Sequence, residues 1–280
     1  VDVFGRKIFR PYKGKKLFFF FSKTQAFLEI DDNSLIIKIK VCSAEAPEKN
    51  DKRTMKNLAV ITGADGGMGT EITRAVAQAG YRVVMACYHP EKGCGVCERL
   101  KAETGNQELE VMPLDLSSLA SVAGFADRLL QRGERIELLM NNAGTLETGL
   151  HITADGLERT VSVNYVGPYL LTRKLLPLLG EGSRVVNMVS CTYAIGRLDF
   201  PDFFRRGRKG SFWRIPIYSN SKLALTLFTL DLSSRVKDRG IVVNCADPGI
   251  VSTKIISMHM WFDPLTDIFF RPFIRTPRQG

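Results

Sequence analysis

Tyr218 and Lys222, four residues apart, are the side chains in this sequence best suited to moving a proton. On a helix, that spacing places both side chains on one face, one turn apart. A tyrosine hydroxyl has a reference pKa of about 10, and a neighbouring ammonium group favours its ionised form. Such a pair can exchange a proton with a carbonyl or alcohol oxygen. The pair also occurs by chance in many helices, so it needs support from its surroundings.

A glycine-rich segment, Thr62-Gly-Ala-Asp-Gly-Gly-Met-Gly69, supplies part of that support. It follows an apolar run and opens a helix, with Gly63, Gly67, Met68 and Gly69 at the turn. Glycine tolerates positive φ and lets the backbone approach a pyrophosphate, and a helix N-terminus offers free N–H groups to phosphates. The segment favours a dinucleotide-binding loop, although tight packing alone would also explain glycines at a turn.

The composition is that of an ordinary globular protein, with 45% hydrophobic and 24% charged residues among 280. The net charge of +10 divides equally between residues 1–54 and 55–280, so the larger part is only mildly basic. No apolar run approaches the ~20 residues that a membrane-spanning helix needs. Six irregularly spaced cysteines do not form a disulfide pattern, which indicates a reducing compartment and a cytoplasmic protein.

No metal site is expected from the cysteines and histidines. Cys94 and Cys97 form a lone C-x-x-C, and a zinc site needs about two further ligands at suitable spacing. The three histidines, His89, His151 and His259, show no metal-binding spacing. A redox pair is the other interpretation of the two thiols, but two unrelated thiols in a helix are favoured.

The chain divides near residue 50, where the polar segment 44–54 is typical of a linker. Residues 1–54 hold no recognisable chemistry, one expected strand over Leu35–Val41, and no methionine before Met55. Our hypothesis is that Met55 is the natural start and that residues 1–54 are an artefactual or disordered extension. The alternative is a real, weakly ordered extension. Residues 55–280 then form a single catalytic domain.

Residues 55–280 alternate between expected strands and expected helices. Strands are expected over 58–62, 82–87, 109–114, 136–140, 184–189 and 241–246, with helices ending near Ala79 and spanning 92–103, 118–131, 154–179 and 218–237. Apolar strands that alternate with helices imply a parallel sheet covered on both faces. Right-handed crossovers then predict an α/β fold with a Rossmann-like, doubly wound parallel sheet.

Four features in a fixed order resemble the short-chain dehydrogenase/reductase family: the glycine loop, Asn-Asn-Ala-Gly over Asn141–Gly144, the strand-closing Ser190, and Tyr218 with Lys222. Shorter motifs resemble its retinol-dehydrogenase-like branch, namely Ser219–Ala224, Val186–Ser190, Gly196-Arg197 and the late Arg275-Thr-Pro. The resemblance covers residues 55–280 and implies a nicotinamide-dependent oxidoreductase. The family has a further helix and strand beyond this point, so the domain is expected to be truncated at its C-terminus.

The resemblance also implies the catalytic residues. Tyr218 is the acid or base, Lys222 binds the nicotinamide ribose, and Ser190 hydrogen-bonds the substrate oxygen. Asn164 holds a water molecule in the proton relay. Taken singly, Ser190 would be a strand-end hydroxyl, Asn164 a buried polar helix residue and Tyr218 a core aromatic.

The remaining cofactor-binding positions are implied in the same way. They are Thr62, Gly63, Gly67, Met68 and Gly69 of the glycine loop, Tyr88, Asp115, Leu116, Asn141, Ala143, Gly144, Tyr218, Lys222, Pro248, Gly249, Val251 and Thr253. An acid at the end of the second strand would select NAD, but Cys87 stands there. Tyr88 replaces the usual arginine of NADP enzymes, and Lys92 can supply a positive charge. NADP is therefore preferred, with NAD left open.

The substrate is expected to be a small alcohol or carbonyl compound, with an apolar one favoured. An aromatic and basic loop over residues 199–214 would wall its pocket, and the apolar segment 255–273 lies where the family has a lid. A homodimer or homotetramer is expected, and no nucleic acid. The alternatives are a non-catalytic dinucleotide-binding protein on the same fold and a basic surface-binding module.

Overall fold

The structure is a computed structural model that describes residues 26–31, 34–41, 57–198 and 214–249. The chain divides into two compact units, Val1–Thr54 and Met55–Gly280. In the first unit, β1 (Ala26–Asp31) and β2 (Ser34–Val41) pair as an antiparallel hairpin. Strand β2 confirms the strand predicted there, whereas β1 was not predicted.

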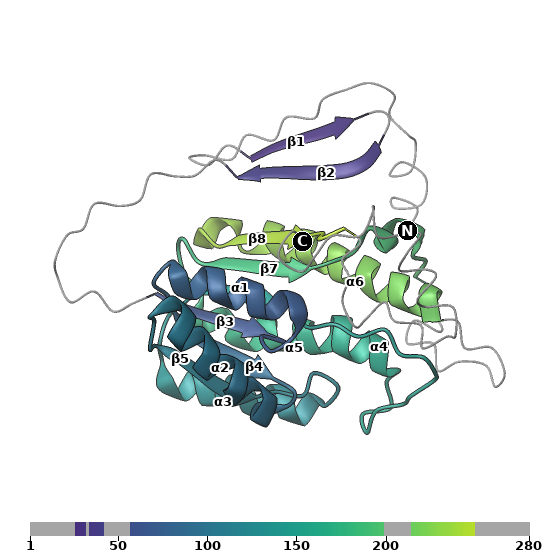
Figure 1. Cartoon of the computed structure of the whole chain (residues 1–280). Helices are drawn as coiled ribbons and strands as arrows, with labels where there is room; N and C mark the ends of the chain where they lie inside the picture. The colour runs from purple at the N-terminus through teal and green to yellow at the C-terminus, as the bar shows by residue number, and fades with distance from the viewer. Residues whose placement is uncertain (1–25, 32–33, 42–56, 199–213, 250–280) are drawn as a thin grey trace, which may run out of the picture. The chain divides into compact units, whose positions relative to one another are not determined.

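A six-stranded parallel sheet forms the centre of the second unit (Figure 1). Its strands are β3 (Leu58–Thr62), β4 (Arg82–Cys87), β5 (Leu109–Pro113), β6 (Ile136–Asn141), β7 (Arg184–Met188) and β8 (Val242–Ala246). The spatial order is β5-β4-β3-β6-β7-β8, so the chain starts at the centre and reverses its direction of travel between β3 and β6. Ligands of doubly wound folds bind at this switch point, beyond the carboxyl ends of the strands. All six strands and the predicted fold class are confirmed.

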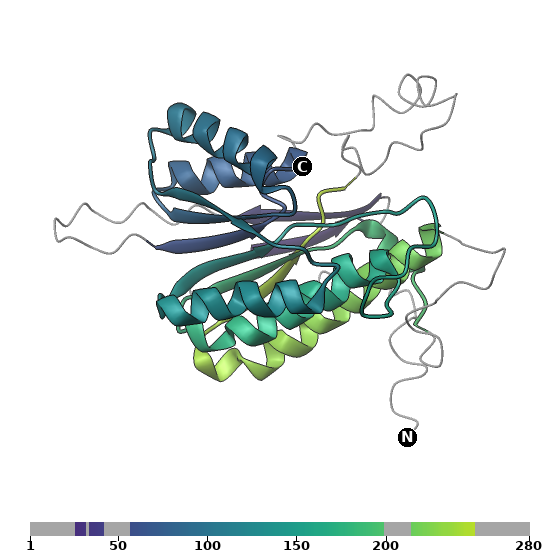
Figure 2. The same ribbon diagram turned by 90° about the horizontal axis from the view of Figure 1, so that it is seen from below.

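Helices cover both faces of the sheet, as Figure 2 shows. Helices α1 (Gly67–Gln78) and α2 (Pro90–Thr104) lie on one face, and α3 (Leu119–Arg132), α5 (Gly167–Leu175) and α6 (Arg214–Arg235) lie on the other. Each face has its own apolar core, because alternate residues of the buried strands point to opposite sides. The chain turns into α3 where the Ser118 hydroxyl accepts a hydrogen bond from the Ser121 amide, as expected for a serine cap.

The helix predicted over residues 154–179 is not continuous. It begins later, at α4 (Arg159–Val161), passes through a π-helical segment, η1 (Ser162–Val166), and continues as α5 and a short 3₁₀ turn, η2 (Leu176–Leu178). Pro168 has no N–H to donate to the carbonyl of Asn164 four residues earlier, so regular α-helical bonding is interrupted here. Such π segments often accompany functional sites.

Candidate active site

The glycine loop joins β3 to α1 at the carboxyl edge of the sheet. Gly63 has a φ of +62°, in the left-handed region that favours glycine. A Cβ on Gly69 would lie 1.9 Å from the Gly63 carbonyl oxygen, so only glycine lets the helix pack against the loop. The first turn of α1 contains no acidic residue, Gly66 caps it without a side chain, and Gly67 is exposed. This helix end therefore fits an anionic pyrophosphate.

Thr62 ties the glycine loop to the segment that follows β6. Its hydroxyl accepts hydrogen bonds from the amides of Asn142 and Ala143, both at 3.0 Å. The Asn142 side chain in turn donates to the carbonyls of Thr62 and Gly63. Thr62 thus fixes the loop from behind, while Asn142 is a supporting residue that the sequence analysis did not assign.

The end of β4 corrects the predicted role of Cys87. Its side chain is fully buried, a Cβ on Gly93 would lie 2.9 Å from its sulfur, and burial raises the pKa of its thiol to about 12. Cys87 is therefore a core residue and does not face a ribose. Tyr88, at 51% exposure, is the side chain that faces outward, and its ring lies 5.9 Å from the guanidinium carbon of Arg159.

Lys92 was expected to supply a positive charge, but it is not a free cation. Its ammonium lies 2.6 Å from the carboxylate of Asp65 and 2.8 Å from the Asp65 carbonyl oxygen. Asp65 belongs to the glycine loop and also contacts Cys87. An acid thus stands beside the end of β4, although it belongs to the loop that follows β3.

Asp115 and Leu116 follow β5 at the same edge. One carboxylate oxygen of Asp115 accepts hydrogen bonds from the amide and the hydroxyl of Ser117. The other carboxylate oxygen has no hydrogen bond within the described part of the chain, so it can meet an adenine amino group. The Leu116 carbonyl accepts from Ser162 and lies 2.6 Å from the position of a Cβ on Gly167.

Asn141, at the end of β6, belongs to a buried polar network between the sheet and the helices. Its amide donates to Thr172 at 2.9 Å and to Asn187 at 2.7 Å, and Asn187 donates to Thr229 on α6 at 2.9 Å. The side chain of Asn141 therefore joins the sheet to the helices that cover it. Ala143 and Gly144 lie closer to the site, because a Cβ on Gly144 would be 3.5 Å from the Lys222 ammonium.

Lys222 is buried on α6, with only 3% of its surface exposed. Its ammonium donates to the Met188 carbonyl at 2.8 Å, at the end of β7, and lies 5.6 Å from the ring centroid of Tyr218. Burial lowers its pKa to about 8, and the carboxylate of Asp247 opposes this shift. The predicted proximity of Lys222 and Tyr218 is therefore present.

Ser190 and Tyr218 lie close enough for their hydroxyl groups to interact. Ser190 ends β7 and caps the 3₁₀ helix η3 (Cys191–Ile195), where its oxygen accepts from the amide and hydroxyl of Thr192. Burial raises the pKa of Tyr218, and the Ser190 hydroxyl only partly opposes this rise. This direction is opposite to the one expected from Lys222, because the ionised phenol loses its hydration when it is buried.

Asn164 lies on the π segment η1 and is fully buried. Its side chain accepts from the Thr145 amide at 2.7 Å and donates to the Thr145 carbonyl and to the Ser221 hydroxyl. These three bonds occupy the side chain, so a water held at this position would bind the backbone. The Asn164 carbonyl lacks its α-helical donor, since that donor would be Pro168.

The loop after β8 brings Asp247, Pro248 and Gly249 to the same edge. Gly249 has a φ of +72°, and its amide donates to the Asp247 carboxylate at 2.9 Å. Asp247 raises the pKa values of both Lys222 and Tyr218, a role that the sequence analysis missed. Val251 and Thr253 lie outside the described residues, as do the loop 199–213 and the segment 255–273.

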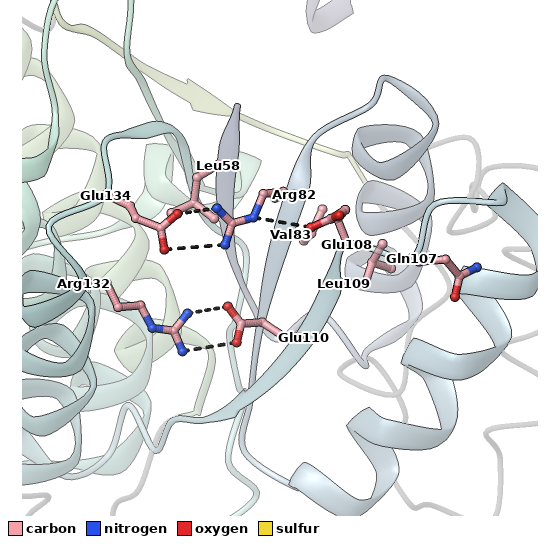
Figure 3. Close-up of a pocket in the computed structure, with 9 residues that line it drawn as sticks. All are labelled: Leu58, Arg82, Val83, Gln107, Glu108, Leu109, Glu110, Arg132 and Glu134. Carbon is pink, nitrogen blue, oxygen red and sulfur yellow. Dashed lines mark hydrogen bonds and ion pairs between the residues drawn. The ribbon is translucent and has the colours of Figure 1, made fainter. Parts of the chain in front are cut away.

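The opposite, amino-terminal edge of the sheet carries a hollow of about 460 Å³ without catalytic groups (Figure 3). Arg82 lies between Glu134 and Glu108, while Arg132 pairs with Glu110. Both arginines are thus compensated by carboxylates. Within the described ranges, no group of three His, Cys, Asp or Glu side chains is arranged to hold a metal ion.

Comparisons with known proteins agree with the fold. Residues 57–201 match the model of the short chain dehydrogenase family. Human retinol dehydrogenase 11 is 38% identical over 224 residues, which are 79% of this chain and 69% of the relative. Mouse polyprenol dehydrogenase is 39% identical over 212 residues, which are 73% and 62% of the two chains. The structure of Pseudomonas aeruginosa RhlG with NADP has a TM-score of 0.59 and 25% identity, covering 75% of this chain and 78% of that one.

The chain belongs to the short-chain dehydrogenase/reductase family, in its retinol-dehydrogenase-like branch. It is an NAD(P)-dependent oxidoreductase that acts on a small molecule with an alcohol or carbonyl group. The non-catalytic alternative is not favoured. None of the helices in the described ranges is both long and apolar enough to cross a membrane.

Proposed function

We propose that Tyr218 and Ser190 carry out proton transfer in an NADP-dependent reduction of lipophilic aldehydes or ketones, or in its reverse. The closeness of their hydroxyl groups, beside the buried Lys222, is the observation that carries this proposal. When bound, the reduced cofactor supplies the hydride. Tyr218 donates the proton to the forming alkoxide, and the Ser190 hydroxyl hydrogen-bonds the same oxygen.

Lys222 has two roles in this proposal. Its ammonium, fixed on the Met188 carbonyl, binds the ribose of the nicotinamide and stabilises the tyrosinate left after proton transfer. Asn164 returns the proton from solvent by holding a water on its backbone carbonyl. The side chain of Asn164 keeps Thr145 and the π segment in place.

Along the carboxyl edge, the cofactor contacts follow the loops. The first turn of α1 at Gly67, Met68 and Gly69 binds the pyrophosphate, and Asp115 with Leu116 holds the adenine. Ala143, Gly144, Pro248, Gly249, Val251 and Thr253 surround the nicotinamide end. The preference for NADP is supported by Tyr88, which is not an acid at the outward-facing position after β4, and by the NADP complex of RhlG. The carboxylate of Asp65 alone would favour NAD by repelling a 2′-phosphate, but its ion pair with Lys92 neutralises its charge.

A lipophilic substrate is supported by the relatives, whose names specify retinol and polyprenol. Both are long isoprenoid alcohols, so a shared pocket for an apolar chain is the simplest inference for this branch. The test is oxidation of NADPH by a panel of short, long and branched aldehydes and ketones. Turnover of long aldehydes above short ones is expected. The absence of turnover with every member would contradict the proposal.

A homodimer, or a homotetramer built from it, is supported by exposed apolar side chains on α5 and α6. Tyr169, Leu227 and Leu230 are 39%, 46% and 62% exposed. Light scattering should give a dimer mass that Leu230→Glu reduces to that of a monomer.

A cytoplasmic location is supported by the five described cysteines, all of which are free thiols.

The catalytic domain is proposed to span residues 55–280, with residues 1–54 an extension that plays no part in the chemistry. The division of the chain between Thr54 and Met55 supports this assignment. So does the position of the site, since Thr62 is the first of its residues.

A further inference from the structure

Arg214 stands on the same helix face as Tyr218 and Lys222. Arg214, Tyr218 and Lys222 follow one another at intervals of four residues along α6. Lys222 lies at the cofactor end, against Met188 and Gly144. Arg214 therefore lies one turn, about 6 Å along the axis, beyond Tyr218 on the side away from the cofactor.

The guanidinium of Arg214 is only partly satisfied. Its Nη2 atom donates to the Leu146 carbonyl at 3.3 Å, in the loop after β6. Its Nε atom is buried and has no acceptor within the described part of the chain. A buried N–H without an acceptor costs free energy, and the cost is greater for a charged group.

No carboxylate of the described residues forms an ion pair with Arg214. Glu147, next to Leu146, is the nearest acid along the loop. It is already engaged with the Thr145 hydroxyl at 2.9 Å and with Arg159 at 3.6 Å. Among the described residues, Arg214 thus has no carboxylate partner, in contrast to the paired arginines at the opposite edge.

We propose that Arg214 binds a carboxylate of the substrate, so that the preferred substrates are apolar oxo acids rather than neutral carbonyl compounds. This inference rests on the proposed function and narrows its substrate class. A guanidinium presents paired N–H donors in a plane and binds carboxylates in a bidentate manner. The carboxylate satisfies the buried Nε, and the carbonyl of the same molecule then lies at Tyr218.

The test compares oxo acids with their methyl esters at saturating NADPH. Wild-type protein is expected to reduce an acid with a kcat/KM at least tenfold above that of its ester. Arg214→Ala should remove this difference through KM of the acid, with the ester unchanged. Arg214→Lys should retain part of it, because the charge remains but the planar fork is lost. Arg235→Ala is the matched control, since Arg235 lies exposed at the far end of α6 and pairs with Asp231.

Binding of a non-reducible fatty carboxylate, measured by calorimetry, provides a readout that does not depend on turnover. Wild type should bind it at least tenfold more tightly than Arg214→Ala. Oxo phosphonates serve as a second arm, and preference for them over the carboxylates would reassign the anion. Equal use of acid and ester by wild type would overturn the inference alone. Loss of both substrates in Arg214→Ala would instead give the residue a purely structural role. Failure of wild type with both the acid and the ester would overturn the inference if long aldehydes are still reduced, and would contradict the proposed function if they are not.

Discussion

The carboxylate of Asp65 lies 2.6 Å from the ammonium of Lys92, and this pair joins the glycine loop to the first turns of α2. The carboxylate is nearly buried, whereas Lys92 is exposed. The pair lies next to Cys87, which occupies the end of β4, where an acid would select NAD. The net charge of the Asp65–Lys92 pair is close to zero, so the pair attracts a 2′-phosphate only weakly.

Replacing Asp65 by Asn is expected to strengthen NADPH binding relative to NADH. The change removes a negative charge near the phosphate and releases Lys92 to pair with it. The gain should be on the order of 1 kcal/mol, or about fivefold in affinity, for a solvent-accessible pair. Fluorescence titration of both cofactors measures it. Glu98→Gln on the outer face of α2 is the control, and an equal effect of both variants would show that only net charge matters.

Tyr218→Phe is expected to lower kcat by about 10²–10⁴-fold, because the phenyl ring cannot donate a proton. Cofactor affinity should change little, since the hydroxyl acts on the substrate oxygen. Steady-state kinetics and a cofactor titration separate the two effects. The exposed Tyr169→Phe is the control. More than a tenth of the original kcat in Tyr218→Phe would remove this residue from acid–base catalysis.

Lys222→Met is expected to abolish turnover and yet to stabilise the fold at neutral pH. Burial of the ammonium lowers its pKa from 10.5 to about 8, which corresponds to roughly 3 kcal/mol of native-state cost below pH 8. The variant also loses the hydrogen bond to Met188, which offsets about 1 kcal/mol of this stabilisation.

The pH dependence gives the sign of this effect. Between pH 8 and 10.5 the unfolded chain binds more protons than the native one, so wild-type stability rises with pH in this window. The advantage of Lys222→Met should therefore be largest below pH 8 and disappear above 10.5. Urea unfolding across this range checks the prediction, with the exposed Lys237→Met as control. An advantage that does not vary with pH would contradict the buried charge.

Glu158 should stabilise the helix that carries Asn164 through its cap and not through its charge. Its carboxylate is fully buried, accepts from the Val161 amide at 2.9 Å, and leaves Oε1 without a partner in the described residues. Glu158→Ala is expected to cost about 2–4 kcal/mol, from the lost cap and the cavity. Glu158→Gln keeps the acceptor and should cost little.

Burial also raises the pKa of Glu158 above its ordinary 4.5. The native state then binds more protons than the unfolded chain, so wild-type stability should fall as pH rises above about 4.5. Glu158→Gln should lack this dependence. Equal pH profiles for the two proteins would show that the carboxyl group stays ionised in both states.

The sheet could be predicted because strands buried on both faces have nearly continuous apolar sequences, as in Leu58–Thr62 and Arg82–Cys87. The π segment could not, because its residues have the same apolar spacing as a regular helix and only Pro168 marks the interruption. The antiparallel strand β1 was missed for a similar reason, since its residues Ala26–Asp31 carry no strict alternation.

The candidate site residues were chosen by their order in the chain, and the sequence does not predict their surroundings. The sequence does not reveal that Cys87 points into the core, because its direction depends on the packing of α2 against β4. Nor does it show that Asp65 pairs with Lys92, 27 positions away. The pKa of Tyr218 was predicted in the wrong direction because desolvation depends on how deeply α6 is buried.

The two ends of each strand can be engineered independently. Arg82 opens β4 and Cys87 closes it, so about 17 Å of extended chain separates the ion pairs of Figure 3 from the catalytic edge. That separation is about twice the Debye length at physiological ionic strength, which is ~8 Å. Charges around Arg132 and Glu110 are therefore open to redesign for solubility or heat resistance. Such changes should leave proton transfer at Tyr218 unaffected.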